Sequence, residues 1–181
     1  LHADTTVSDT TDYHAVKHTL VGVTSHLIGR SATGLRYWIF DGAARRWSKP
    51  GGDHDSPVLG EVNLFDVAAF ESALYLVALN GSGINLYSQA SSGWHSDDIG
   101  DAIGLASTDA VSTLAVAVLG SDLHLVVDVD LQPQHAIYNI TSKTWKQPLQ
   151  PITSLRSMAY EIGGLTLHAT PPQLYLGISE R

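Results

Sequence analysis

Short apolar runs separated by polar turn residues make up most of the chain. Runs such as LAVAVLG (114–120) and LYLVAL (74–79) are rich in Leu, Val and aromatic residues, and clusters of Gly, Ser, Asn and Asp bound them. This pattern is typical of strands joined by hairpins. No stretch of ten or more residues shows convincing 3.6-residue apolar periodicity, so we predict a nearly all-β chain. NGSG (80–83) is then a hairpin turn, because no helix follows it.

Three units repeat an aromatic residue seven positions before a tryptophan. They are FDGAARRW (40–47), YSQASSGW (87–94) and YNITSKTW (138–145). The tryptophans recur at nearly equal intervals, at Trp47, Trp94 and Trp145, and the interval is close to the length of a propeller blade, roughly 40–50 residues. Before each tryptophan, serines come into the same register, at Ser25, Ser72 and Ser121. Leucines follow two places later, at Leu27, Leu74 and Leu123.

Each unit is therefore interpreted as a blade of short strands. The first strand carries small residues at matching places, namely Val21-Gly22, Ala68-Ala69 and Ala117-Val118. Small residues suit inner strands that converge on a central axis. The three tryptophans recur at one repeat position, which favours filling between blades over stacking on a sugar. FDGAARRW is then the turn between the outer strands of a blade.

The units predict an all-β fold with one domain, 1–181, built as a four-bladed β-propeller. The blades are 20–60, 61–107, 108–152 and a partial 153–181. The segment 1–19 supplies the outer strand that the last blade lacks, and pairing it there closes the ring and removes exposed strand edges. The alternative is a partial propeller, completed by a second copy of the chain, or a fragment of a larger one.

Three known repeats resemble these units. The aromatic-x6-Trp spacing, with Asp41 after Phe40, resembles the kelch repeat, although LIGR, LVAL and LVVD stand where kelch repeats carry a diglycine. The turn Phe40-Asp41-Gly42…Trp47 looks similar to the blades of fungal fucose-binding propeller lectins. LFDVAAF (64–70) resembles the hemopexin repeat, itself four-bladed. All three resemblances imply a propeller, and they imply different functions.

Composition and charge narrow the possible partners. The chain is 44% hydrophobic and 15% charged, as in soluble globular proteins. Its apolar runs are far shorter than the roughly 20 residues that span a bilayer. A net charge of −8 makes nucleic acid a poor partner. The chain has no cysteine and so no disulfide framework. Two N-glycosylation sequons, at Asn80 and Asn139, favour a secreted, extracellular protein.

The candidate ligand-binding residues centre on Trp38. In RYWIF it falls where the second unit has Asn85, so the repeat does not require a tryptophan there. Trp38 and its neighbours Arg36 and Tyr37 are therefore candidates for ligand binding, with edge packing as the alternative. His95 and His124 complete the candidate ligand-binding set, although a hydrogen-bonded place in a strand is the default for a strand histidine.

No metal, cofactor or catalytic residue is predicted. The clusters GGDHDS (51–56) and WHSDDIGD (94–101) combine histidine with carboxylates, but neither has a recognised ligand spacing. We interpret both as solvated turns. No GxSxG elbow or paired-carboxylate motif indicates a hydrolase.

The leading hypothesis is a carbohydrate-binding lectin, because repeated blades give repeated shallow pockets. The first alternative is an enzyme with one axial pocket, an isomerase, lyase or cyclase that uses histidine as general acid or base on a small apolar molecule. The unrepeated Trp38 favours that alternative. The second alternative is a protein-interaction propeller, as the kelch resemblance implies. The expected partner is a carbohydrate or other small molecule, bound by one chain or by a homo-oligomer.

Overall fold

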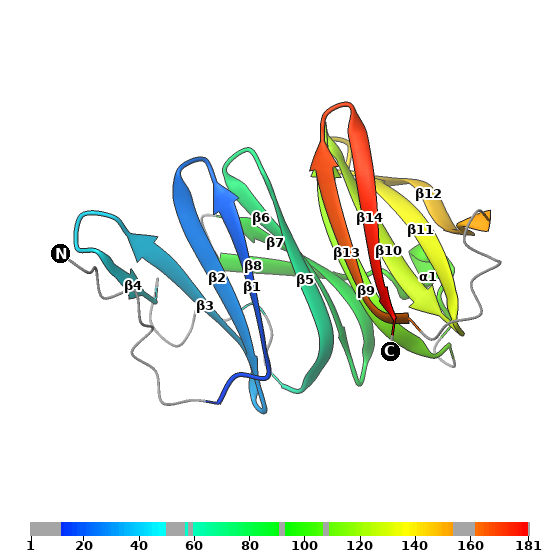
Figure 1. Ribbon diagram of the computed structural model, residues 1–181, viewed down its shortest axis with the longest axis horizontal. Coiled ribbons are helices and arrows are strands. Elements are labelled where there is room, and N and C mark those ends of the chain that lie inside the picture. The colour runs from blue at the N-terminus through cyan, green and yellow to red at the C-terminus, as the bar shows by residue number, and fades with distance from the viewer. Residues whose placement is uncertain are drawn as a thin grey trace.

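The computed structural model describes residues 12–49, 57, 60–90, 93–106, 109–153 and 162–180. Its strands form four antiparallel sheets, numbered here in chain order (Figure 1). The first sheet contains β1 (Ala15–Val21), β2 (Thr24–Ser31), β3 (Gly34–Asp41) and β4 (Arg46–Ser48). The second contains β5 (Val62–Phe70), β6 (Ala73–Asn80), β7 (Gly83–Ala90) and β8 (Gly93–Asp98). The third contains β9 (Val111–Leu119), β10 (Asp122–Val129), β11 (Gln132–Asn139) and β12 (Thr144–Pro151). The fourth contains β13 (Ile162–Thr170) and β14 (Gln173–Glu180).

The predicted all-β class is confirmed, with one short addition. A one-turn helix, α1 (Gly100–Ile103), follows β8, and its Ile103 packs into the core between the second and third sheets. The NGSG turn also has the predicted form, since Asn80 pairs with Gly83 across the β6–β7 hairpin. Within the described part of the chain, no helix has the length and apolar character needed to cross a membrane.

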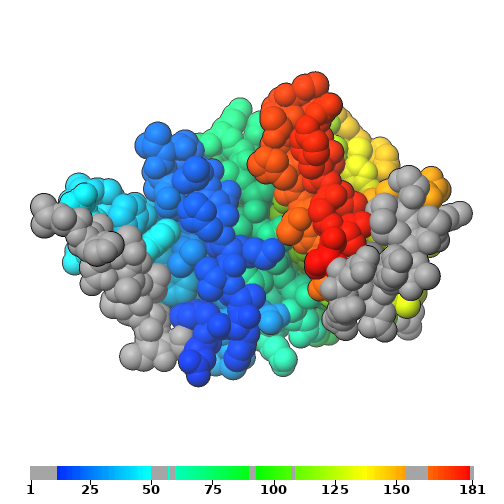
Figure 2. Space-filling view, in the orientation of Figure 1, coloured from blue at the N-terminus to red at the C-terminus, as the bar shows by residue number. Residues whose placement is uncertain are grey.

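The first strands of the four sheets stand next to one another. β1 lies beside β5, β5 beside β9 and β9 beside β13 (Figure 1). All four line one shallow groove of about 440 Å³. Figure 2 shows β1 in blue and the fourth sheet in orange and red, with the green surface of the second sheet between them. The sheets are therefore arranged around a common groove, each contributing its first strand.

The structural repeat is exact in length through the first three sheets. The second strands of these sheets begin at equal intervals along the chain, at Thr24, Ala73 and Asp122. The third strands begin at the same interval, at Gly34, Gly83 and Gln132. All six of these strands have the same length. From the third sheet to the fourth the interval is slightly longer, because β14 begins at Gln173. We call residues that occupy the same place in different sheets equivalent.

This register corrects the predicted alignment of the first two units by two residues. Trp94 pairs with Gln89 across β7 and β8, whereas Tyr87 pairs with Ser96. The seven-residue spacing in YSQASSGW therefore does not mark the pair found in the other two units. Because successive side chains of a strand point to opposite faces, a slip of two residues leaves every residue on its predicted face. The sequence pattern alone could not reveal the error.

The outer hairpins of the first and third sheets have the predicted form. In FDGAARRW, the Asp41 carboxylate accepts two backbone N–H groups of the turn at 2.9 Å, and these bonds lower the pKa of Asp41. Asn139 caps the equivalent turn of the third sheet. The last turn residue is left-handed in both, with φ of 53° at Arg45 and 55° at Lys143. Each hairpin carries a cross-strand aromatic pair, Phe40 with Trp47 or Tyr138 with Trp145.

The predicted closure of the ring by 1–19 is not seen in the part of that segment that the structure describes. Residues 15–19 belong to β1 and pair with β2 in the first sheet, so they are not an outer strand of the fourth. Gly22, predicted to lie in the inner strand, is instead in the β1–β2 turn with φ of 60°. The fourth sheet has two strands, and the described residues form no closed ring. The described residues therefore show the repeat of sheets without its closure.

Each pair of neighbouring sheets encloses an apolar core. We call the face of a sheet toward the preceding sheet its upstream face, and the opposite one its downstream face. In the second sheet the upstream face contributes Phe65, Val67, Leu74 and Leu76. Their equivalents in the third sheet are Leu114, Val116, Leu123 and Leu125. The fourth sheet follows with Leu165, Leu167 and Leu176. Burying one such side chain contributes roughly 1.5–3 kcal/mol.

Polar contacts join the first strands of neighbouring sheets at specific residues. Asp66 on β5 reaches both neighbours: one carboxylate oxygen lies 3.1 Å from Lys17 Nζ on β1, and the other accepts the Val116 N–H of β9 at 2.9 Å. One level further along, the Leu165 N–H of β13 donates to Thr113 Oγ1 of β9 at 3.3 Å. These contacts set how far neighbouring sheets slide against each other.

Candidate ligand-binding site

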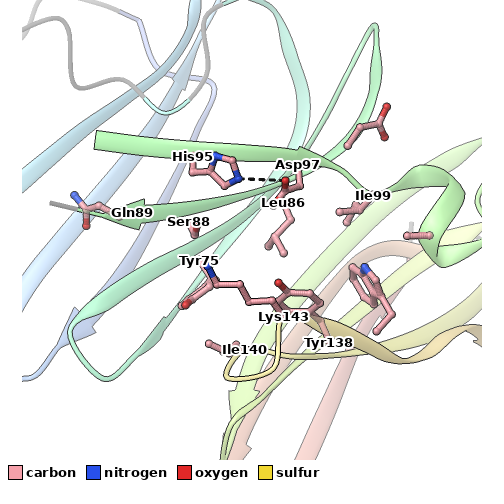
Figure 3. Close-up of a pocket in the computed structure, with 13 residues that line it drawn as sticks. Tyr75, Leu86, Ser88, Gln89, His95, Asp97, Ile99, Tyr138, Ile140 and Lys143 are labelled. Carbon is pink, nitrogen blue, oxygen red and sulfur yellow. Dashed lines mark ion pairs between the residues drawn. The ribbon is translucent and has the colours of Figure 1, made fainter. Parts of the chain in front are cut away.

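An open pocket lies between the outer parts of the second and third sheets. Its volume is about 530 Å³, within the range of small-molecule sites. Strands β6, β7 and β8 supply one side, and the β11–β12 hairpin supplies the other (Figure 3). The lining includes Tyr75, Leu86, Ser88, Gln89, His95, Asp97, Tyr138, Lys143 and Trp145.

The pocket lies where the second sheet has a leucine and the first has a tyrosine. Leu86 on β7 is equivalent to Tyr37 on β3. Between the first and second sheets, the Tyr37 ring meets Trp94 edge to face, with 5.8 Å between ring centroids. Between the second and third sheets, Leu86 does not extend as far. Trp145, which takes the place of Trp94 there, therefore lines an open space.

One wall of the pocket is aromatic. Tyr138 and Trp145 are paired across β11 and β12, with ring centroids 5.1 Å apart and planes inclined at 54°. Both also contribute to the core between the second and third sheets, which holds the two rings in place. Tyr75 reaches the same pocket from β6 on the other side. Such ring surfaces match apolar ligand faces and keep a polar edge available.

The other wall is polar and accessible. His95 Nε2 lies 3.2 Å from an Asp97 carboxylate oxygen, and the two side chains are 68% and 59% exposed (Figure 3). An ion pair this exposed holds its partners weakly, so a ligand can compete for either one. Lys143 enters from the β11–β12 turn, and Ser88 lines the pocket from β7. The pocket therefore offers a carboxylate, an imidazole, an ammonium and a hydroxyl.

The two tyrosines of the pocket are held in their neutral form. Burial raises the pKa of Tyr75, and the nearby Glu71 carboxylate raises it further. Burial also raises the pKa of Tyr138, with smaller effects from Asp97 and Tyr75. Both phenols consequently remain protonated near neutral pH and can donate hydrogen bonds. Asp97 and Tyr138 line the same pocket from different sheets, so the polar and aromatic walls face each other.

The structure places the three predicted residues of β3 away from this pocket. Trp38 is only 3% exposed and meets the Tyr13 ring edge to face at 5.1 Å. It is equivalent to Tyr87, not to Asn85, so the repeat does place an aromatic residue there. Tyr37 is 4% exposed and belongs to the core between the first and second sheets. Arg36 is half-buried on the same strand.

The two predicted histidines lie in different places. His95 lines the pocket, whereas His124 lies on β10 in the third sheet, where its Nδ1 is 2.9 Å from His135 Nε2. His26 on β2 is equivalent to His124, contrary to the predicted register. His26 Nδ1 correspondingly lies 2.6 Å from the Tyr37 hydroxyl. Of the five predicted ligand-binding residues, only His95 lines the pocket.

The groove between the inner strands has less binding chemistry. It is lined by four equivalent triplets, residues 18–20, 67–69, 116–118 and 167–169. Ala68-Ala69 and Ala117-Val118 face it, as predicted for inner strands, with Thr19-Leu20 at the matching place in the first sheet. Only His18 and His168 among the lining residues carry titratable groups. This groove is where the enzyme hypothesis would place its pocket.

Metal ligands do not gather anywhere in the described part of the chain. No group of three or more His, Cys, Asp or Glu side chains there could hold a metal ion. In WHSDDIGD, Asp98 caps the backbone N–H of Gly100 at 3.0 Å, which is a structural role. The second predicted cluster, GGDHDS (51–56), lies outside the described residues.

The two sequons differ in their surroundings. The Asn139 side chain is only 8% exposed, and its Nδ2, the atom that N-glycosylation modifies, donates to Asp122 at 2.7 Å and to Ser121 Oγ at 3.0 Å. In the β6–β7 turn, the Asn80 Oδ1 accepts the Ser82 N–H and leaves Nδ2 without a hydrogen bond among the described residues. Asn80 is thus the better placed of the two for modification.

Comparison with models of known protein families and with curated proteins finds no match to this chain. The kelch, lectin and hemopexin resemblances therefore stay predictions. The residues that sequence reasoning missed are mainly Tyr75, Leu86 and Tyr138. If the units had been aligned by the interval between equivalent strands, one sequence signal of the pocket would have been visible: the tyrosine at position 37 is replaced by leucine at the equivalent position 86.

Proposed function

We propose that the chain is a carbohydrate-binding module of the propeller type, with its ligand bound between the second and third sheets. One observation carries the proposal: a single open pocket joins the aromatic pair Tyr138–Trp145 to the polar pair His95–Asp97. A pyranose ring has an apolar face of C–H groups and a rim of hydroxyls. A site with an aromatic surface beside exchangeable hydrogen-bonding groups suits both parts of such a ring.

Four pocket residues have a specific role in this proposal. Trp145 provides the surface for the apolar sugar face. The Asp97 carboxylate accepts hydrogen bonds from sugar hydroxyls, and charge-assisted bonds of this kind are stronger than neutral ones. The Tyr75 and Tyr138 phenols, which stay protonated, act as donors. An open pocket leaves part of the ligand in water, so we expect weak affinity at a single site.

A glycan array with the full chain tests the proposal, with Trp145→Ala as the main variant. The matched control is Trp47→Ala, because Trp47 is the equivalent residue of the first sheet and lines no pocket described above. We expect binding to a related set of glycans that Trp145→Ala reduces at least tenfold and Trp47→Ala leaves intact. Thermal unfolding of each variant checks that it is folded.

Two outcomes would overturn this assignment. Silence of the native chain across a broad array would reject carbohydrate binding. Equal losses in both tryptophan variants, with both still folded, would move the site away from this pocket. Asp97→Asn measures the contribution of the polar wall to binding by itself, because it removes the carboxylate charge and leaves the aromatic wall unchanged.

A further inference from the structure

Among the residues that the structure describes, the first sheet carries an upstream face that no preceding sheet covers. At the repeat positions of Phe65, Leu76 and Trp94 it has Val16, Leu27 and Trp47. The side chains of the later sheets are buried in their cores, and Phe65 is only 5% exposed. In the first sheet, Val16 is 51% exposed and Leu20 on the same face is 54% exposed. The second, third and fourth sheets each bury their upstream face against the sheet before them. The first sheet has the same kind of face, and no sheet among the described residues packs on it.

The fourth sheet presents the opposite kind of surface at the other end of the row. Its downstream face carries His168, Tyr175 and Ser179, all of them exposed, and Tyr175 is 52% exposed. The downstream face of the first sheet combines the apolar core residues Ile28, Leu35 and Tyr37 with polar groups. It meets the second sheet through Lys17, which pairs with Asp66, and through Arg30, which donates to the Val62 and Asn63 carbonyls. In every sheet-to-sheet interface that the structure describes, the upstream face of one sheet therefore packs on the downstream face of the sheet before it, and that downstream face carries apolar as well as polar groups.

We propose that two copies of the chain assemble head to tail. The upstream face of each first sheet packs on the downstream face of the other copy's fourth sheet, and the open groove becomes the axis of one ring. A contact between two different faces of the same protein is heterologous, and two such contacts close a ring of two copies when the copies are related by a half turn. The occupant follows from continuity with the existing sheet-to-sheet interfaces, because in each of them an upstream face packs on the downstream face of the sheet before it.

The repeat register fixes which residues meet. The observed contact of the Val116 N–H with Asp66 joins an upstream strand to the strand before it. His18 stands at the repeat position of Val116 in the first sheet, and Thr166 stands at that of Asp66 in the fourth. The assembly therefore places His18 of one copy beside Thr166 of the other. Both residues are exposed in the single chain.

Disulfide trapping tests this contact directly, because the chain has no cysteine of its own. We would prepare His18→Cys and Thr166→Cys as separate proteins, mix them and oxidise them. The expected result is a cross-linked pair from the mixture and little from either protein alone. Val23→Cys, at a fully exposed turn residue, replaces His18→Cys in the control mixture and should not cross-link.

The double variant His18→Cys/Thr166→Cys separates two kinds of closure. Head-to-tail assembly gives a disulfide-linked dimer. A ring closed within one chain would give an internal disulfide at the mass of a single chain, and this would overturn the proposal. Absence of any cross-link in the mixture and in the double variant would overturn it equally.

The native mass gives an independent measurement. Light scattering on the unmodified protein should show twice the chain mass of 19.4 kDa. Val16→Asp places a charge on the apolar face and should return the mass to one chain. Leu131→Asp, at a residue 65% exposed in the β10–β11 turn, should leave the dimer intact. A single-chain mass at all concentrations would reject the assembly, and so would a dimer unaffected by Val16→Asp. Neither readout requires a sugar, so failure here and failure of the proposed function are distinguishable.

Discussion

The interface between the first and second sheets and the one between the second and third use the same repeat positions and reach opposite results. In the first interface, Tyr37 contacts Trp94 and lies within hydrogen-bonding distance of His26, and the space is filled. In the second, Leu86 takes the place of Tyr37, and a pocket of about 530 Å³ remains beside Trp145. The comparison shows that both interfaces enclose an apolar core, and that the second also leaves a pocket where a leucine replaces a tyrosine.

Filling the first interface has a cost. The Trp94 indole N–H is buried and has no hydrogen-bond partner among the described residues. A buried unpaired donor costs about 1–3 kcal/mol. The apolar area that Trp94 and Tyr37 bury must offset that cost. The second interface avoids it by leaving its tryptophan beside an open pocket, which makes Trp145 available to a ligand.

The largest expected effect tests what the two interfaces share. Leu76 and Leu125 are equivalent residues of the two cores, and neither is exposed to solvent. Replacing either one by alanine should lower the free energy of unfolding by about 2–5 kcal/mol. Leu131→Ala, at an exposed turn residue, is the control and should change it by less than about 0.5 kcal/mol. Urea unfolding measures all three. A loss at only one of the two core positions would mean that the interfaces are not equally packed.

The second prediction opens the first interface. Tyr37→Leu copies the residue of the second sheet, removes the contact with Trp94 and leaves His26 without its hydroxyl partner. We expect a loss of about 2–4 kcal/mol from the combined cavity and lost hydrogen bond. Tryptophan emission should shift to longer wavelength as water reaches Trp94. An unchanged spectrum and an unchanged stability would show that Tyr37 is not what fills this interface.

The local parts of the fold could be predicted from the sequence because they depend on neighbouring residues. The hairpin turn at NGSG follows from the turn chemistry of Asn and Gly, and the outer turn in FDGAARRW follows from an aspartate that caps it. The alternation of apolar and polar residues likewise placed the strands. These signals lie within a few residues of the structure that they specify.

The register between units and the site could not be predicted in the same way. A shift of two residues keeps the alternation of apolar and polar residues intact. The sequence pattern therefore predicted Tyr87 as the cross-strand partner of Trp94, whereas the structure pairs Trp94 with Gln89. The pocket depends on residues from two sheets, Leu86 on one side and Trp145 on the other. Ring closure depends on contacts between the first and last units. Single-sequence periodicity carries no information on which distant faces meet.

The third prediction closes the pocket by enlarging Leu86, a buried residue that also lines it. Leu86→Tyr introduces into the second interface the residue that fills the first. The added ring should occupy the space beside Trp145 and reduce glycan binding at least tenfold, and because Leu86 is buried the change should also cost about 1–3 kcal/mol of stability. Titration of a bound glycan against both proteins measures the effect. Full binding by a folded Leu86→Tyr protein would place the ligand elsewhere.

The smallest effect concerns pH and contrasts the third sheet with the second. Burial lowers the pKa of His26, and it lowers the pKa of His124 and His135 as well, with Asp122 partly opposing the shift at His124. A histidine whose pKa is lower in the folded state binds fewer protons there than in the unfolded chain. Stability is therefore complete above the ordinary value of 6.5 and falls as the pH drops from there toward the folded values.

The second sheet has Tyr75 and Leu86 at the positions of His124 and His135, and neither gains a proton in this range. The double substitution His124→Tyr/His135→Leu gives the third sheet the same pair. Urea unfolding at pH 7, 6 and 5 should then show a shallower loss of stability than in the native chain. His26 is untouched in this variant, so part of the loss should remain. An unchanged slope would mean that the His124–His135 pair does not contribute, and that the acid sensitivity of the protein resides in the first interface, where His26 lies beside Tyr37.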